Sequence, residues 1–366
     1  MGQLKVVVGG QAGSEAKGAC AAFLSRQAVA DGHNSMVVRV AGPNAGHTAY
    51  DADGRSWAFR QIPVGVVVDD RAQAVIAAGS EIDVEVLRDE IERLEAGGLK
   101  IRHRLFVDAQ ATILSEGHKA RESKDGLVGK LGSTGKGVGA ARADRIMRSA
   151  EIAFTSKALA DLGVHVLDTR RMLYSAITDD DTVVILEGTQ GYVLGLHAGY
   201  YPQCTSSDCR AIDFLSMAGI DPHWVNRDDY EVWVVMRTYP IRVAGNSGPL
   251  EGETSWEELE LEVERTTVTQ KVRRVGAWNA AWASDAVIAN GGPNVVHVAL
   301  SMVDYVVPNA ANATSLEDLD EQTVMELQAA VLRVEGDAGA TVDLIGTGPN
   351  SYIDLRVVRE SELARA

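Results

Sequence analysis

Residues 9–18 form a glycine-rich segment that directly follows the apolar run 4–8 and precedes the alanine-rich segment 19–30. This order predicts a strand, a tight turn and a helix. Glycines let backbone N–H groups approach an anion closely, and the following helix adds the positive end of its dipole. Lys17 can reach phosphate oxygens, although Gly18 follows it where a Walker A sequence has serine or threonine. The segment predicts a P-loop-like phosphate-binding turn; the alternative is an ordinary strand-to-helix turn.

Further apolar runs recur along the chain and are bounded by Gly, Asp or Asn. They comprise residues 36–40, 64–68, 74–78, 105–108, 183–186, 232–237 and 295–300. Most of these runs do not alternate apolar with polar residues. Strands that are buried on both faces have this composition, so we expect a mainly parallel central sheet that is covered by helices.

Helical patterns lie between the apolar runs. The clearest spans residues 82–96, where Ser80 and Asp83 resemble a capping pair and Gly97 ends the helix. Residues 278–289 and 324–334 are also predicted to be helical. No fixed-period repeat, low-complexity tract or linker interrupts the chain. We therefore expect one large α/β domain over residues 1–366, with a mainly parallel sheet flanked by helices.

The charge and cysteine content exclude several classes of function. The 366 residues include 35 Lys and Arg against 51 Asp and Glu, a net charge of −16, which argues against broad binding to nucleic acid. Small anionic substrates remain compatible with local basic clusters. Three cysteines predict free thiols and a reducing cytoplasm. No secretion signal or membrane span is expected, because no apolar run reaches the necessary length.

Two loops after predicted strands carry residue types suited to ligand binding. The first, residues 41–48, contains Asn44 and His47, and ligand contacts gather on strand-end loops. Histidine is also well suited to proton transfer near neutral pH. The second loop, residues 130–139, holds four glycines, two hydroxyls and two lysines, which favours an anion; a flexible surface loop is the alternative. Three arginines follow this loop at helical spacing, Arg142, Arg145 and Arg148. They form either part of a binding surface or a solvated basic face of a helix.

Later turns add polar residues in similar positions. Residues 187–191 follow a strand, residues 201–208 are rich in hydroxyls, and residues 346–350 form a tight turn. Residues 266–274 are basic and hydroxyl-rich within an acidic protein. Arginine pairs in such a segment suit carboxylate or phosphate binding, and a basic surface strand is the alternative.

Five of these segments, in order, resemble motifs of the adenylosuccinate synthetase family. They are residues 13–18, the Asn-Ala-Gly-His-Thr sequence of residues 44–48, and residues 132–139, 187–191 and 201–207. The resemblance covers most of the chain. It implies a ligase that transfers a γ-phosphoryl group to the purine O6, after which the aspartate amine displaces phosphate, with Mg²⁺ as cofactor.

The resemblance also implies the roles of particular residues. Ser14 and His47 would be catalytic, with His47 as the acid, and Ser14 and the Gly46 carbonyl would contact Mg²⁺. The purine monophosphate would be held by Ser14, Asn44, Ala45, Thr134, Arg148, Gln190 and Thr205. Arg148 would reach into a partner subunit's site, which implies a homodimer. L-aspartate would be held by Thr269, Gln270, Lys271, Arg273 and Arg274. The nucleoside triphosphate would be held by Gly13, Ser14, Glu15, Ala16, Lys17, Gly18, Gly46, His47, Thr48, Asp304 and Gly348.

Two departures from the family pattern suggest a particular substrate pair. Ser14 stands where the family has an aspartate that accepts the purine N1 proton, and a hydroxyl is a much weaker base. Met302 replaces the lysine of the guanine-recognition motif, so ATP becomes plausible. With the short chain, these features resemble the phage-type branch that uses dGMP, aspartate and ATP. The alternatives are an ordinary member that uses IMP and GTP, or a catalytically silent nucleotide-binding paralogue.

Overall fold

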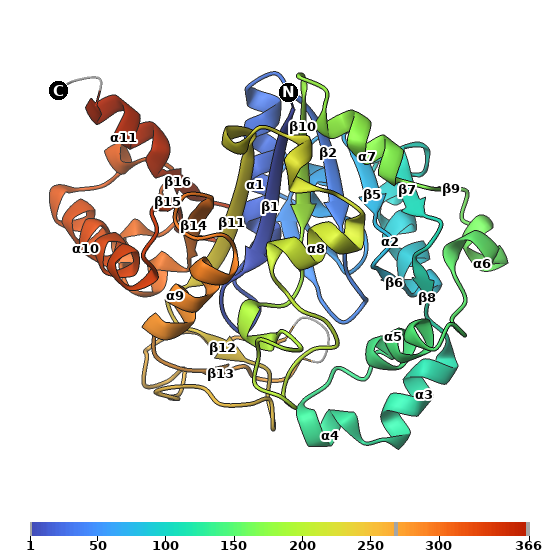
Figure 1. The fold of residues 1–366 in the computed structure, drawn as a ribbon. Helices are drawn as coiled ribbons and strands as arrows, with labels where there is room; N and C mark the ends of the chain where they lie inside the picture. Colours follow the sequence, from blue (N-terminus) through green and yellow to red (C-terminus); the bar gives the residue numbers. More distant parts are fainter. Residues whose placement is uncertain (1, 267–269, 364–366) are drawn as a thin grey trace.

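A ten-stranded sheet forms the centre of the protein in a computed structural model that describes residues 2–266 and 270–363 (Figure 1). The strand order is β16-β15-β14-β11-β1-β10-β2-β5-β7-β9, and neighbouring strands are parallel except for β15 and β16. The strands are β1 (Gln3–Gly9), β2 (Asn34–Arg39), β5 (Gln73–Ile76), β7 (Leu105–Asp108), β9 (His165–Leu167), β10 (Thr182–Glu187), β11 (Tyr230–Arg237), β14 (Val296–Ser301), β15 (Val342–Gly346) and β16 (Tyr352–Asp354). The predicted mainly parallel sheet is therefore confirmed.

Both faces of this sheet are buried under helices. One face packs against α1 (Lys17–Ala30) and α2 (Val84–Ala96), and the other against α7 (Arg170–Ile177), α8 (Ala211–Ala218), α9 (Ala280–Ala289) and α10 (Glu321–Ala338). Alternate residues of one strand enter different hydrophobic clusters: Val6 and Val8 lie in one, and Val7 in the other. This double burial explains why the strands are apolar without alternation.

One predicted strand is wrong. Residues 64–68 begin as a buried 3-10 helix, η1 (Val64–Val67), rather than a strand. A short apolar run fits a buried strand and a buried helix turn equally, and here Pro63 precedes the turn while the Val64 N–H donates to the Glu187 carboxylate at 2.6 Å. The capping pair of α2 is also only half correct. Asp83 caps the helix, whereas the Ser80 hydroxyl donates to the Arg39 carbonyl at 3.3 Å.

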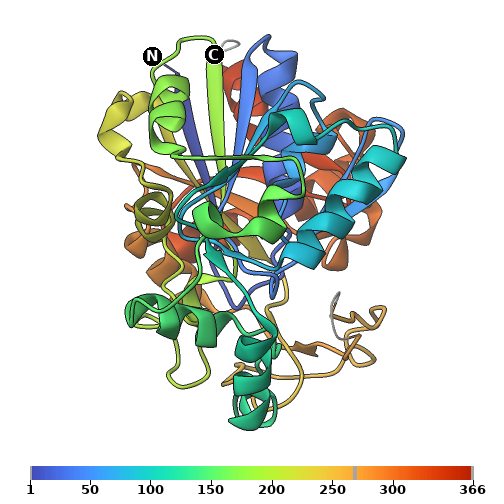
Figure 2. The same cartoon turned by 90° about the vertical axis from the view of Figure 1, so that its right-hand side faces the viewer.

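The connections at the carboxyl ends of the strands are long and carry smaller elements. They include α3 (Glu116–Lys124), α4 (Leu127–Leu131), α5 (Val138–Ile146), β12 (Ile241–Arg242) and β13 (Arg274–Val275), which lie beyond the sheet in both views (Figures 1 and 2). The remaining elements are β3 (His47–Tyr50), β4 (Ser56–Phe59), β6 (Glu81–Ile82), β8 (Thr112–Ile113), α6 (Lys157–Ala160) and α11 (Leu355–Leu363). Because the carboxyl ends of parallel strands meet at one edge, this is where a ligand site is expected.

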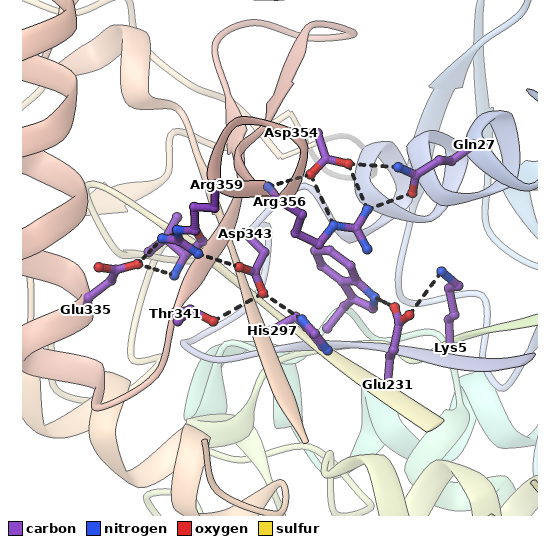
Figure 3. A network of polar contacts seen from close by, with 12 residues as sticks. Lys5, Gln27, Glu231, His297, Glu335, Thr341, Asp343, Asp354, Arg356 and Arg359 are labelled. Atoms are coloured by element: carbon purple, nitrogen blue, oxygen red, sulfur yellow. Dashed lines mark hydrogen bonds and ion pairs between the residues drawn. The ribbon is translucent and has the colours of Figure 1, made fainter. Parts of the chain in front are cut away.

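The opposite part of the sheet carries a polar network beside the amino-terminal halves of β1, β11 and β14 (Figure 3). Lys5 Nζ lies 3.2 Å from the Glu231 carboxylate, which also accepts the indole N–H of the fully buried Trp233 at 2.7 Å. The ring of His297 stacks on Trp233 at a centroid distance of 5.1 Å. These contacts replace apolar packing in this part of the core.

The same network holds α11 against the sheet (Figure 3). Arg356 donates to Asp354 and to Gln27 of α1, each at 2.8 Å, and its guanidinium lies 4.9 Å from the centre of the Trp233 ring. Arg359 lies 2.7 Å from Asp343. Charged and stacked groups therefore join the last described helix to the strands.

Two further predictions concern the cysteines and the membrane. Cys20, Cys204 and Cys209 are free thiols, as expected from their number and spacing. In residues 2–266 and 270–363, no helix combines the length and the apolar composition needed to cross a bilayer.

Glu231→Gln is expected to destabilise the fold by about 1–3 kcal/mol at pH 7, because buried Lys5 loses its partner. Burial opposes ionisation of Glu231, but Lys5, His297, Trp233 and Arg356 outweigh it and lower its pKa. A lowered native pKa stabilises the fold above the usual carboxyl pKa, and this stabilisation is lost as the pH falls towards the native pKa. Urea unfolding should therefore show a wild-type advantage that narrows below about pH 4.

Exposed Glu326 on α10 provides the matched control. Glu326→Gln should change stability by less than about 0.5 kcal/mol. A pH-independent difference between Glu231→Gln and the wild-type chain would contradict the assigned role of Glu231.

Candidate active site

The predicted phosphate loop connects β1 to α1 and contains a carboxylate of its own. Glu15 is fully buried, and its Oε1 accepts the N–H groups of Gly13 at 2.7 Å and Gln11 at 3.2 Å. Its Oε2 lies 2.6 Å from Nζ of buried Lys17. Glu15 therefore holds the loop and Lys17 in place within the protein itself.

The backbone of this loop is strained at two non-glycine residues with positive φ, and the same strain occurs in other predicted site segments. Ser14 and Ala16 have φ values of 60° and 70°, which non-glycine residues seldom adopt. Of the six other such residues, Arg148, Gln190, Gln270 and Met302 lie in segments predicted to bind ligands, whereas Glu260 and Asn312 do not. Strained backbone gathers at functional sites, so these positions agree with a site at this edge.

Close packing joins the phosphate loop to two other predicted motifs. A Cβ atom on Gly18 would lie 2.7 Å from the Cβ of His47, so only glycine lets α1 approach β3. A Cβ atom on Gly191 would lie 2.3 Å from the Gln11 carbonyl and 2.5 Å from Glu15. The structure thus brings together residues 13–18, 44–48 and 187–191, as their positions at strand ends predicted.

His47 lies in a buried cluster with Glu187 and Arg39. Its Nδ1 is 3.0 Å from Glu187 Oε2 and 2.6 Å from Arg39 Nη1, and that same Arg39 nitrogen donates to Glu187 Oε2 at 2.9 Å. Nδ1 can donate to Glu187 or accept from Arg39, depending on the tautomer. Both contacts use Nδ1, so Nε2 is the nitrogen left for a ligand.

Burial also sets the protonation of this cluster. Burial, Arg39 and Lys17 together hold the pKa of His47 well below its usual value, so the imidazole is neutral at pH 7. Burial raises the pKa of Glu187 to about 7, against the opposing effects of Arg39 and the backbone N–H of Val64. Perturbed groups of this kind, next to a phosphate-type loop, are typical of catalytic sites.

The second predicted anion loop, residues 130–139, already holds a carboxylate from α3. The Glu122 side chain is buried and accepts the N–H groups of Gly137 and Gly139, each at 2.8 Å. The N-terminus of α5 therefore binds Glu122, and a ligand of this loop must use its earlier residues. Thr134, the predicted ligand, lies in that earlier part and is half-buried.

The other residues predicted to bind the monophosphate lie around the same edge. Asn44, Ala45, Gln190 and Thr205 are partly exposed in the loops that follow β2 and β10. The Arg39 guanidinium donates to the Ala45 carbonyl at 3.1 Å. Arg148 differs, because it is exposed just after α5, and its side chain has no hydrogen bond to any residue of the described segments.

The predicted aspartate-binding segment includes a hairpin. Arg273 N–H donates to the Glu264 carbonyl at 2.9 Å, and the side chains pair at 2.6 Å. Glu264 also pairs with Arg237 at the end of β11, and the Arg237 guanidinium donates to the Ser14 carbonyl at 3.2 Å. Thr269 lies outside the described residues. Arg273 is therefore linked to the phosphate loop.

Gln270, Lys271 and Arg274 differ from Arg273 in their surroundings. Gln270 and Lys271 are exposed on the hairpin. Arg274 pairs with Glu253 at 2.6 Å and donates to the Gly248 carbonyl at 2.8 Å. Its guanidinium is thus engaged in holding the neighbouring loop.

The predicted base-recognition residues lie at the ends of β14 and β15. Met302 follows β14, and Asp304 lies in the 3-10 turn η7 (Val303–Tyr305), where burial, with Glu264 nearby, raises its pKa. Gly348 lies in the turn between β15 and β16 and packs against Asn312. The Ser301 hydroxyl donates to the Glu15 carbonyl at 2.9 Å, so this region adjoins the phosphate loop.

A resident metal centre is not built from side chains in the described segments, where no group of three or more His, Cys, Asp or Glu could hold an ion. Ser14 and Gly46 are both exposed and offer a hydroxyl and a carbonyl oxygen. Mg²⁺ accepts such sparse oxygen donors when substrate phosphates and water complete its shell. These residues therefore fit a magnesium ion that arrives with the nucleotide.

Several residues of the site were not predicted, namely Arg39, Glu122, Arg237 and Glu264. Arg39 and Arg237 each end an apolar strand, and a charge in such a run was the available signal. Glu122 and Glu264 lie in strongly polar stretches, where one more charged residue gives no signal of a site. Together, the site combines a phosphate loop, a buried histidine and an arginine cluster, which suits phosphoryl transfer followed by capture of a carboxylate substrate.

Comparison with known proteins identifies the family. A family model described as adenylosuccinate synthetase matches residues 6–155 and 149–308. The adenylosuccinate synthetase of Thermococcus sibiricus is 35% identical over 356 residues, covering 96% of this chain and 98% of the relative. That of Pyrococcus horikoshii is 35% identical over 347 residues, covering 94% and 95%.

Two solved structures share the fold. The succinoaminodeoxyadenylate synthetase (PurZ) of cyanophage S-2L, bound to dGMP and dATP, has a TM-score of 0.79 at 28% identity, covering 100% of this chain and 99% of the other. The adenylosuccinate synthetase of Plasmodium falciparum has a TM-score of 0.79 at 20% identity, covering 97% and 100%, and shows the fold alone. The chain therefore belongs to the adenylosuccinate synthetase family, whose members are ligases that form a C–N bond with aspartate.

Proposed function

We propose that this ligase condenses L-aspartate with dGMP, using ATP, to give N6-succino-2-amino-2′-deoxyadenylate. The observation that carries the proposal is Ser14, which is exposed at the rim of the phosphate loop. By resemblance to the family, an aspartate at this position accepts the N1 proton of IMP, and a serine hydroxyl is a much weaker base. Guanine carries an N1 proton as well, so dGMP differs from IMP here through its 2-amino group. A serine still leaves room for, and can hydrogen-bond to, the 2-amino group of guanine.

The identity of the triphosphate is supported by Met302. Its apolar side chain stands where the family's guanine motif has a lysine, so the preference for GTP is weakened. The S-2L protein, which was solved with dGMP and dATP, matches this chain over its whole length and supports the same substrate classes. An ordinary adenylosuccinate synthetase that uses IMP and GTP is the second candidate, because the curated relatives carry that name.

In the proposed reaction, the γ-phosphoryl group of ATP moves to the purine O6, the N1–H bond breaks with its proton passing to solvent, and ADP leaves. The aspartate amine then forms a bond to C6, the C6–O6 bond breaks, phosphate leaves and the amine loses a proton. Lys17 and the loop N–H groups hold the phosphates, and magnesium, when bound with the nucleotide, neutralises phosphate charge. His47 Nε2 donates a proton or hydrogen bond to the reacting oxygens, since phosphate charge favours the protonated imidazole.

A homodimer forms part of the proposal. Arg148 is exposed with φ 64°, and the preceding residues Ile146 and Met147 are 75% and 74% exposed. Exposed large apolar side chains of this kind are typical of a surface that another protein covers. A second copy of this chain, with Arg148 contacting the neighbouring nucleotide, would explain both features.

Turnover with defined substrate pairs tests the proposal. The protein is incubated with aspartate and Mg²⁺, and with either dGMP plus ATP or IMP plus GTP, while phosphate release is followed. We expect release with dGMP and ATP. Release with IMP and GTP alone would establish the second candidate, and release with neither pair would indicate a silent nucleotide-binding paralogue.

His47→Ala is expected to lower kcat by roughly 10²–10⁴, the usual contribution of a general acid. The imidazole is buried, so urea unfolding of the same variant checks that the fold is intact. Turnover close to that of the wild-type chain would remove His47 from the mechanism.

Arg148→Ala is expected to weaken dGMP binding without affecting stability, because the side chain is exposed. Titration calorimetry measures the affinity. Mixing Arg148→Ala with His47→Ala protomers should restore part of the activity, since one site of each hybrid dimer contains neither change. Unchanged dGMP affinity, or no recovery on mixing, would refute the cross-subunit role.

A further inference from the structure

Glu264 contacts three segments that the proposed function assigns to different substrates. Its carboxylate pairs with Arg273 of the aspartate-binding hairpin at 2.6 Å and with Arg237 at the end of β11. It also accepts the Tyr305 hydroxyl at 3.0 Å, next to the predicted base-recognition residue Asp304. One carboxylate therefore joins the aspartate, phosphate and base subsites.

The contact with Arg273 is fixed by the hairpin backbone. The Arg273 N–H donates to the Glu264 carbonyl at 2.9 Å, and the next residues, Arg265 and Val272, form an antiparallel bridge. Glu264 and Arg273 are thus cross-strand neighbours, whose side chains meet on one face. The backbone sets the pair, and the carboxylate orients the guanidinium.

The contact with Arg237 reaches the phosphate loop. The Arg237 side chain is fully buried and donates to the Ser14 carbonyl at 3.2 Å. The side-chain amide of Gln11 bonds to the backbone of the same arginine, with its Nε2 donating to the carbonyl and its Oε1 accepting the N–H, both at 3.0 Å. A displacement of Glu264 would therefore move Arg237 and change its hydrogen bond to the Ser14 carbonyl.

The charges of this group suit an anionic substrate. One carboxylate lies between two guanidinium groups, which leaves one positive charge. In residues 2–266 and 270–363, the buried Nε atoms of Arg237 and Arg273 have no hydrogen-bond partner. Burial opposes ionisation of Glu264, but Arg237 and Arg273 lower its pKa to about 2. Glu264 therefore stays charged at neutral pH, and the excess positive charge of the group attracts a carboxylate.

We propose that Glu264 is a positioning residue that holds Arg273 ready for a carboxylate of aspartate and couples aspartate binding to occupancy of the phosphate loop. The inference rests on the proposed function in that aspartate is the ligand of this hairpin. Without the carboxylate, Arg237 and Arg273 repel one another and lose their fixed orientation. Aspartate binding then weakens and no longer responds to the triphosphate.

Titration calorimetry of the full chain tests this with a non-hydrolysable ATP analogue. The aspartate Kd is measured in the presence of dGMP and Mg²⁺, with and without the analogue. Glu264→Gln should raise the Kd about tenfold or more with the analogue present, the usual size of a lost hydrogen bond to a charged group. The ratio of the two Kd values, which measures coupling, should differ from 1 in the wild-type chain and fall towards 1 in the variant.

Glu258→Gln is the matched control, since Glu258 is exposed in the same segment and, within the described residues, its hydrogen bonds are to Thr254 and Ser255. It should leave both Kd values within about twofold. Wild-type affinity in Glu264→Gln, or a wild-type coupling ratio of 1, would overturn the inference. Absence of aspartate binding to the wild-type chain would overturn the proposed function and this inference with it.

If Glu264→Gln does not fold, Tyr305→Phe provides a second test of the same inference. It removes only the hydroxyl that donates to Glu264 and should weaken aspartate binding about fivefold. An unchanged aspartate Kd in the folded Tyr305→Phe protein would then overturn the inference. Glu264→Asp, which keeps the charge, should lie between Glu264→Gln and the wild-type chain.

Discussion

Buried carboxylates that accept backbone N–H groups hold the loops at the carboxyl edge of the sheet. Glu15 binds the phosphate loop, Glu122 the N-terminus of α5, and Glu187 the turn that starts at Val64. Glu90 accepts three successive N–H groups in the same way, from residues 60–62. Burying a carboxyl group is costly unless its oxygens are hydrogen-bonded. Each loop conformation is thus fixed before a ligand arrives, which reduces the ordering cost of binding.

Much of the fold and the centre of the site could be predicted from local sequence. Strands such as β1 and β10 are apolar on both faces, and glycines mark the turns after them. Parallel strands end at one edge, which places the phosphate loop, His47 and Gln190 on the same side of the sheet; their proximity follows from the strand order β1-β10-β2. Their order along the chain also indicated the family, which the relatives confirm.

The parts of the fold and of the site that the sequence does not predict depend on contacts between residues far apart in the chain. The apolar neighbours of Val64 predict a strand, whereas the turn that it forms depends on Glu187, more than 100 positions later. Glu122 and Glu264 look like surface residues among many acidic ones, and only the packed structure shows which backbone or guanidinium groups they meet. Roles for Thr134, Arg148 and the aspartate-binding residues stay predictions, because they concern ligands and a second subunit.

The polar network around Glu231 lies towards the other end of the strands from the site. A strand such as β11 has eight residues, and at about 3.3 Å per residue the two ends are separated by roughly 25 Å. Different substitutions in that network can therefore lower the stability of the chain to different extents without changing the site at the carboxyl edge of the sheet. Each loss of activity in a site variant can then be compared with a network variant of equal stability, which separates damage to chemistry from damage to folding.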